Sequence, residues 1–253
     1  MKTSACIEML FCDEAPEIYD RISLAAEAGF DAIEFWRWSE REVNRLADAA
    51  AMAQIPISAM VGEPMIPLTR PENQNVFLEG LGQSIEVARI LKCPTLIVQT
   101  GNYFEDLEFE TQQHALINTL KKAGELLEGS GVRIGVEPLN TLIDHPGYFL
   151  HDTKLACTII DSVDHECIGL TYDLYHSMVM SEDPQEVVKN HIKKIFHLHI
   201  ADHPGRNEPG SGKLNLSAQL RWLKEKGYRN YVGHEYRPRS STREALRFSN
   251  NGI

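Results

Sequence analysis

The sequence lacks a long hydrophobic run, paired cysteines and an excess of basic residues, and each absence excludes a class of protein. No stretch approaches roughly 18 consecutive apolar residues, and residues 2–5 do not begin a basic and apolar leader, so we expect neither a membrane span nor secretion. The five cysteines are scattered and form no CxxC pair, which favours a reduced, cytoplasmic setting. A net charge of -11 argues against nucleic acid as a partner.

What the sequence does contain is a regular alternation of strand-like and helix-like segments. Ser39 and Glu42 form a capping box at one helix start, and Pro184 follows Asp183 at another. The strand-like segments are residues 5–11, 30–36, 57–61, 95–99, 132–137, 168–173, 195–200 and 231–235. The helix-like segments are 16–28, 39–53, 74–91, 107–128, 153–163, one beginning at 183–184, 217–226 and 242–249.

This alternation predicts the fold. Strands that alternate with helices pair in parallel, and eight such units in 253 residues match a (β/α)8 barrel, which typically has about 250. We therefore expect an α/β protein with a single TIM barrel domain over residues 1–253. The alternative is an open Rossmann-like sheet, which is weakened because no GxGxxG motif follows the first strand-like segment.

Four consecutive strand-like segments end on ionisable residues. These residues are Glu137, Asp173, His199 and Glu235. Side chains alternate along a strand, so in residues 195–200 the apolar Phe196, Leu198 and Ile200 would face the helices, and His197 and His199 the barrel axis. Small residues two positions earlier in the other three segments, among them Gly135 and Gly233, would leave room above them for a ligand.

Three carboxylates and an imidazole that converge inside a barrel need a counter-cation. Oxygen-rich donors with one nitrogen suit Mn²⁺, Mg²⁺ or Co²⁺, so we expect a divalent-metal site formed by Glu137, Asp173, His199 and Glu235. Each residue taken alone would be read as a solvated strand-end group. Glu34 ends another strand-like segment and is either a salt bridge in the barrel floor or a substrate contact. His197 is expected to be a hydrogen-bonded interior histidine rather than a ligand.

Several motifs at the strand ends resemble one known family. They are Gly135-Val136-Glu137-Pro138-Leu139-Asn140, Asp144-His145-Pro146-Gly147-Tyr148, Tyr172-Asp173-Leu174-Tyr175-His176, His199-Ile200-Ala201-Asp202-His203-Pro204-Gly205-Arg206, Glu208-Pro209-Gly210 and Gly233-His234-Glu235-Tyr236. The chain resembles the xylose isomerase-like barrel superfamily, and within it the hydroxypyruvate isomerase and sugar epimerase branch.

The resemblance implies roles for these residues. Glu137, Asp173, His199 and Glu235 would bind the metal, and Glu137 and Glu235 would also be the catalytic carboxylates. His176 and Arg206 would bind the substrate. The implied enzyme is an isomerase of hydroxypyruvate type that acts on a 2-oxo or hydroxy acid or a small sugar through a metal-bound cis-enediolate. Hydroxypyruvate isomerases often have glutamine at the position of His199, whereas ketose 3-epimerases have histidine, so epimerisation on the same site is the first alternative.

Arg206 could pair with a substrate carboxylate through two hydrogen bonds, and a loop salt bridge with Glu208 is its alternative. The expected partner is a small carbohydrate or hydroxy-oxo acid, and a homo-oligomer is expected from similar barrels. Three other functions stay open: a metal-dependent endonuclease for damaged DNA, a lyase acting on oxidised sugars, and a non-catalytic binding barrel.

Overall fold

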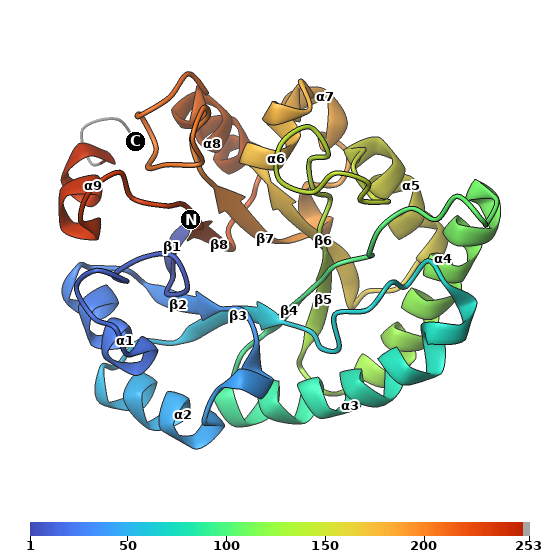
Figure 1. Cartoon of the computed structure of the whole chain (residues 1–253), viewed down its shortest axis with the longest axis horizontal. Coiled ribbons are helices and arrows are strands. Elements are labelled where there is room, and N and C mark those ends of the chain that lie inside the picture. Colours follow the sequence, from blue (N-terminus) through green and yellow to red (C-terminus); the bar gives the residue numbers. More distant parts are fainter. Residues whose placement is uncertain (250–253) are drawn as a thin grey trace.

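A computed structural model describes residues 1–249 and contains a closed barrel of eight parallel strands in the order β1 to β8 (Figure 1). The predicted (β/α)8 barrel is confirmed, and the open-sheet alternative is wrong. The strands are β1 (Lys2–Cys6), β2 (Ala32–Phe35), β3 (Ile57–Val61), β4 (Thr95–Val98), β5 (Arg133–Val136), β6 (Ile168–Asp173), β7 (Ile195–Ile200) and β8 (Tyr231–His234).

Helices surround the barrel and connect its strands (Figure 1). They are α1 (Ile18–Glu27), α2 (Val43–Met52), α3 (Gln74–Leu91), α4 (Phe109–Leu127), α5 (Thr153–Val163), α6 (Leu174–Val179), α7 (Pro184–Val187), α8 (Leu216–Glu225) and α9 (Thr242–Ser249). In α5, the buried residues Ala156, Ile159, Ile160 and Val163 recur at helical spacing, and burying this face against the barrel stabilises the helix. None of the helices among residues 1–249 is long and apolar enough to cross a membrane.

Two expectations about where an element begins are wrong, and one helix is present that the sequence did not indicate. The first strand is Lys2–Cys6 rather than residues 5–11, because the chain turns after Cys6, whose carbonyl accepts from the Leu10 amide at 2.8 Å. Ser39 does not cap a helix; its amide and hydroxyl both donate to Glu63, and α2 begins only at Val43. Helix α6 was not expected at all. It begins directly after β6 because the Asp173 side chain accepts hydrogen bonds from the first free amides of the helix.

The barrel has two shifts in strand register, one between β2 and β3 and one between β6 and β7. Ile33 pairs with Ile57 but Glu34 with Ala59, and Leu170 pairs with Ile195 but Thr171 with His197. The extra residue in β7 is Phe196. Its ring lies under the Arg133 guanidinium, 4.5 Å from the ring centroid, and against Gly169. The expectation that Phe196 packs toward the helices is therefore wrong, since the extra residue changes the alternation of side chains.

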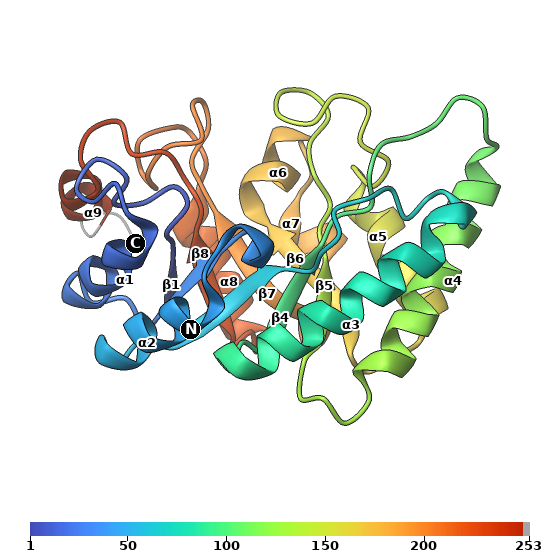
Figure 2. The ribbon, with the colours of Figure 1, turned by 60° about the horizontal axis from the view of Figure 1, so that its bottom comes forward.

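The carboxyl ends of the strands and the longer connecting loops lie at one end of the barrel. Figure 2 shows the loops that follow β4 and β5, together with α6, projecting on the same side. Active sites of (β/α)8 barrels occupy this end because each strand delivers its last side chain there. All four predicted metal-binding residues lie at or just after such strand ends.

Candidate metal centre and active site

The four residues predicted to bind a metal converge at the mouth of the barrel. One donor atom from each lies within 4.8 Å of the others, and all four side chains are buried. They come from four successive strands, which are neighbours in the closed sheet. The residues are Glu137 after β5, Asp173 at the end of β6, His199 in β7 and Glu235 after β8.

His199 lies at the centre of this cluster. Its Nδ1 is 2.9 Å from Glu137 Oε1 and 3.8 Å from Glu235 Oε2, and its Nε2 is 3.0 Å from Glu34 Oε1. Burial alone would lower the pKa of His199, but the charges of Glu235 and Glu34 and its hydrogen bonds to Glu137 and Glu34 raise it well above the ordinary value. The site therefore favours positive charge at its centre.

The carboxylates of the cluster have opposite pKa shifts. Burial raises the pKa of Glu137, and the neighbouring charges of Glu235 and Asp173 add to it. Burial also raises the pKa of Asp173. For Glu235, burial is outweighed by the charges of His199 and Arg206, so that its pKa is lowered. Opposite shifts in two neighbouring carboxylates are the usual basis for separate acid and base roles.

This donor set fits a divalent cation. Three buried carboxyl groups within reach of one another repel as carboxylates, and this repulsion adds to the burial that raises the pKa values of Glu137 and Asp173. A cation held by the three groups would offset that repulsion. Three oxygen donors and one imidazole nitrogen suit Mn²⁺, Mg²⁺ or Co²⁺, although such a set does not select one ion.

His176 is held in one tautomer beside the cluster. Its Nδ1 accepts from the Asn140 backbone amide at 3.2 Å, so the proton of the neutral ring is on Nε2. That Nε2 is buried, has no hydrogen-bond partner among the described residues and lies 3.6 Å from Asp173 Oδ2. Burial lowers the pKa of His176 to about 3, which keeps the ring neutral. His176 is therefore placed to donate one hydrogen bond to a ligand oxygen.

Arg206 reaches the cluster from the loop after β7. Its Nη2 donates to Glu235 Oε2 at 2.6 Å, and its Nη1 is 3.7 Å from Asp144 Oδ1. The alternative pairing with Glu208 is wrong, because Glu208 pairs with Arg239 instead. Asp144 was not singled out from the sequence; the only available signal was its place in a loop motif. It accepts from Asn140 of the same loop and from Tyr175 of α6, and so fixes this loop to α6 beside Arg206.

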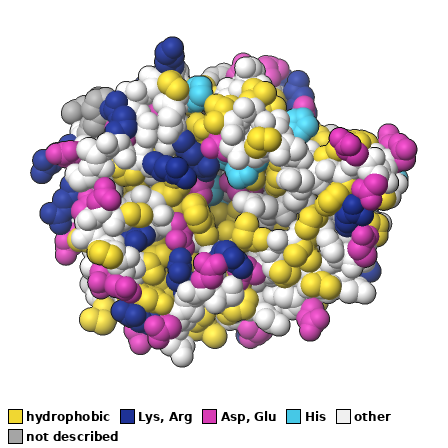
Figure 3. Space-filling view, in the orientation of Figure 1, with side chains coloured by type: hydrophobic (Ala, Val, Ile, Leu, Met, Phe, Trp, Pro, Cys, Tyr) yellow, Lys and Arg dark blue, Asp and Glu magenta, His cyan; other side chains and the backbone are white. Residues whose placement is uncertain are grey.

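A cavity of about 250 Å³ opens above the cluster. Figure 3 shows the barrel mouth as a hollow bordered by hydrophobic side chains, with basic and histidine side chains at its edge. Trp36 contributes to its wall and also donates from Nε1 to Glu235 Oε1 at 3.0 Å, a contact that the sequence did not indicate. The cavity is lined, among others, by Trp36, Val61, Met65, Ile97, Leu139 and His145 together with Glu137, His176, His199, Arg206 and Glu235.

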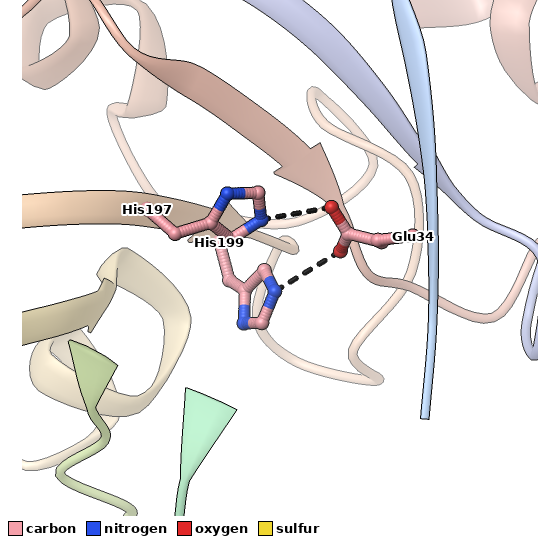
Figure 4. Close-up of side chains that lie close together, drawn as sticks. All are labelled: Glu34, His197 and His199. Atoms are coloured by element: carbon pink, nitrogen blue, oxygen red, sulfur yellow. Dashed lines mark hydrogen bonds and ion pairs between the residues drawn. The ribbon is translucent and has the colours of Figure 1, made fainter. Parts of the chain in front are cut away.

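Glu34 belongs to the floor beneath the cluster (Figure 4). It lies between His197 and His199 and is absent from the residues that line the cavity, so of its two predicted roles the floor ion pair is the one observed. The space beside Gly233 is filled rather than open: a Cβ there would lie 2.5 Å from Glu34 Oε1 and 2.6 Å from His199 Cδ2. Gly233 thus makes room for buried polar side chains, not for substrate.

A family model described as "Xylose isomerase-like TIM barrel" matches residues 22–251. The chain belongs to this family. Among its relatives, "Hydroxypyruvate isomerase" of Escherichia coli K12 is 27% identical over 256 residues, covering 98% of each chain. "2-oxo-tetronate isomerase" of Cupriavidus necator is 28% identical over 250 residues, covering 96% of this chain and 95% of the relative. The predicted class of enzyme, an isomerase or epimerase, is confirmed by such relatives.

Two solved structures superpose over nearly the whole chain. A Brucella melitensis protein titled "AP endonuclease, family 2" has a TM-score of 0.92 with 27% identity and covers 99% of each chain. D-psicose 3-epimerase of Clostridium cellulolyticum H10 has a TM-score of 0.84, covers 100% of this chain and 99% of that one, and at 16% identity shows a shared fold alone.

Proposed function

We propose that this protein is a divalent-metal-dependent isomerase of hydroxypyruvate type. Its substrate would be a small 2-oxo or hydroxy acid, or a small sugar. The observation that carries the proposal is the pair Glu137 and Glu235, which approach His199 Nδ1 from strands β5 and β8 and have opposite pKa shifts. The names of the relatives support the reaction class, and the cavity of about 250 Å³ supports a small substrate.

Glu137, Asp173, His199 and Glu235 would hold the cation. When bound, a divalent cation polarises a substrate carbonyl and stabilises the negative charge that develops on its oxygen. One of the two glutamates removes a proton from the carbon beside the carbonyl, and a proton returns to the neighbouring carbon. With hydroxypyruvate, the proton would leave C3 and return to C2 while the hydroxyl proton moves from the C3 oxygen to the C2 oxygen, which exchanges the positions of the carbonyl and hydroxyl groups.

Two further residues would orient the substrate. The Nε2–H of His176 is aimed at the cluster and can donate to a substrate oxygen. Arg206 holds Glu235 through Nη2, while its Nε is buried with no hydrogen-bond partner among the described residues. A substrate carboxylate would satisfy that donor, because a guanidinium binds a carboxylate through two parallel hydrogen bonds. The expected substrate therefore carries an acid group next to the reacting carbons.

Epimerisation is the second candidate. Carboxyl groups reach His199 from two strands, β5 and β8, which is what removal of a proton from one face and its return to the other would need. In that case, the proton returns to the same carbon that lost it. Both reactions use the same residues, and the placement of the substrate decides between them.

The test is a substrate panel in deuterated water with Mn²⁺, containing hydroxypyruvate, tartronate semialdehyde, four-carbon oxo acids and free ketoses. Deuterium on the neighbouring carbon of the product identifies an isomerase, and deuterium on the inverted carbon an epimerase. We expect Glu137→Gln and Glu235→Gln each to lower turnover about 100-fold or more. The exposed Glu86→Gln is the matched control. Undiminished turnover in both glutamine variants, or cleavage of abasic DNA by the wild type, would contradict the proposal.

A further inference from the structure

A second buried group lies directly beneath the candidate metal centre. Glu34 on β2 has His197 Nε2 at 2.8 Å from Oε2 and His199 Nε2 at 3.0 Å from Oε1. Figure 4 shows the carboxylate facing both rings, one oxygen toward each. All three side chains are almost completely buried, with 2% or less of each residue exposed. Glu34 contacts the cluster through His199.

The barrel departs from regular pairing next to this group. The two register shifts fall between Ile33 and Glu34 and just before the pair formed by Thr171 and His197. The extra residue of β3, Ser58, donates its hydroxyl to the Ile33 carbonyl at 3.1 Å. Such irregularities re-aim the side chains that follow them. Here, the residues that follow are Glu34 and the two histidines.

Gly233 on β8 supplies the space that the group occupies. A Cβ at this position would lie 2.5 and 2.6 Å from the two oxygens of Glu34 and 2.6 Å from His199 Cδ2. Any other residue would displace the carboxylate, the ring or both. The strands β2, β7 and β8 are thus arranged so that Glu34 and His199 are in contact.

The contact between Glu34 and the two histidines determines which ring nitrogen of each histidine carries the proton. An ionised carboxylate only accepts hydrogen bonds, so each histidine that faces Glu34 must carry a proton on Nε2. For His199, this leaves Nδ1, on the side of Glu137 and Glu235, as the nitrogen that can use its lone pair. Metal-binding histidines are commonly fixed in this way by a carboxylate on the far nitrogen.

We propose that Glu34 is a positioning residue for the metal centre: by accepting the Nε2 protons of His199 and His197, it fixes the tautomer and ring orientation in which His199 Nδ1 binds the cation. This inference rests on the metal site of the proposed function. His197 holds the second oxygen of Glu34 and prevents the carboxylate from turning away from His199.

The experiment compares Glu34→Gln with the wild type by calorimetric titration with Mn²⁺ and by ¹⁵N NMR of the histidine rings with Mg²⁺ bound. The glutamine side chain has one acceptor oxygen and one amide NH2 donor, so only one of the two histidines keeps its acceptor. We expect Mn²⁺ affinity to fall about 10- to 100-fold and His199 to lose its single Nε2-protonated form. Gly233→Ala should weaken Mn²⁺ binding as well, although it removes no polar group.

The matched control is Glu63→Gln, which changes another buried carboxylate near the barrel mouth that pairs with Arg37 and Ser39 and does not touch His199. It should bind Mn²⁺ as the wild type does. A folded Glu34→Gln variant with unchanged Mn²⁺ affinity and an unchanged His199 tautomer would overturn the inference alone. A wild type that binds no divalent cation would overturn it together with the proposed function. Two ions per chain, one of them lost in Glu34→Gln, would instead make Glu34 and the histidines a second metal site and overturn the positioning role.

Discussion

Arg206 is the residue that the structure ties most directly to substrate choice. It is the cation next to Glu235, with Asp144 on its other side. We expect Arg206→Gln to raise KM about 10- to 100-fold for substrates with a carboxylate, since a hydrogen bond to a charged group contributes about 1.5–3 kcal/mol. KM for neutral sugars should change much less. The measurement is steady-state kinetics on both substrate classes.

The control for this prediction is Arg239→Gln, because Arg239 pairs with Glu208 away from the cluster. A loss in kcat alone, equal for acids and sugars, would show that Arg206 acts through the pKa of Glu235 instead. Its charge is one of the causes that hold that pKa low.

The cysteines differ in exposure, and this predicts their reactivity. Cys12 is exposed, whereas burial raises the pKa of Cys93 and of Cys157 to about 12. The thiolate is the reactive form, so at pH 8 iodoacetamide should modify Cys12 before the buried thiols. Mass spectrometry of the time course checks this order. Cys12→Ser should remove the fast phase, and fast modification of Cys93 or Cys157 in the folded protein would contradict the assignment.

The sequence predicts the positions of those site residues that lie at the ends of strands, because strand ends can be located from the sequence pattern. Glu137, Asp173, His199 and Glu235 converge as expected because each lies at or directly after the carboxyl end of a strand. Loop residues follow no such pattern. The pairing of Arg206 with Glu235 rather than Glu208 therefore required the structure.

Among the secondary-structure elements, α5 has an N-cap whose contribution to the stability of the protein can be measured. Its N-cap Asp152 accepts a hydrogen bond from the Leu155 amide at 2.8 Å, and neither residue is among those that line the cavity. Asp152→Ala should lower the free energy of unfolding by about 1 kcal/mol without changing activity. Asp152→Asn, which keeps an acceptor, is the control. Chemical denaturation of both variants measures the difference, and equal stability would mean that the cap contributes nothing.

Element boundaries were predicted well where a helix has a periodic face, as in α3 and α5. The predicted start of a helix was wrong where the expected capping residue instead forms hydrogen bonds with a residue distant in the sequence. The capping box at Ser39 failed because Glu63, far away in the sequence, accepts from both its amide and its hydroxyl. The register shift at Phe196 could not be predicted either, since it depends on how β7 pairs with β6.

At the scale of the whole molecule, all four proposed metal donors come from β5 to β8, one half of the closed barrel. A cation there would join neighbouring strands of that half, and binding to the folded state alone stabilises it by about 4 kcal/mol at 1,000 times Kd. We expect Mn²⁺ to raise the unfolding temperature in a single transition, as one domain over the whole chain would show. Calorimetry with and without EDTA is the measurement.

Hydrogen exchange can show which strands are stabilised when the cation binds. With Mg²⁺ bound, amides of β5–β8 should gain more protection than those of β1–β4, because no proposed donor lies on the first half of the barrel. The exception should be Glu34 and its neighbours on β2, which contact His199. Uniform protection of all eight strands would argue that closure of the barrel, and not its second half, responds to the cation.

The two register shifts also matter for protein engineering. A designer who copied Glu137, Asp173, His199 and Glu235 onto the strands of a regular barrel would reproduce the donors but not the strand register that positions Glu34 against His199. Without the extra residues Ser58 and Phe196, β2 would pair with β3, and β7 with β6, in a register different from the observed one. The smallest transferable unit of this centre is therefore the donors together with both irregularities and Gly233.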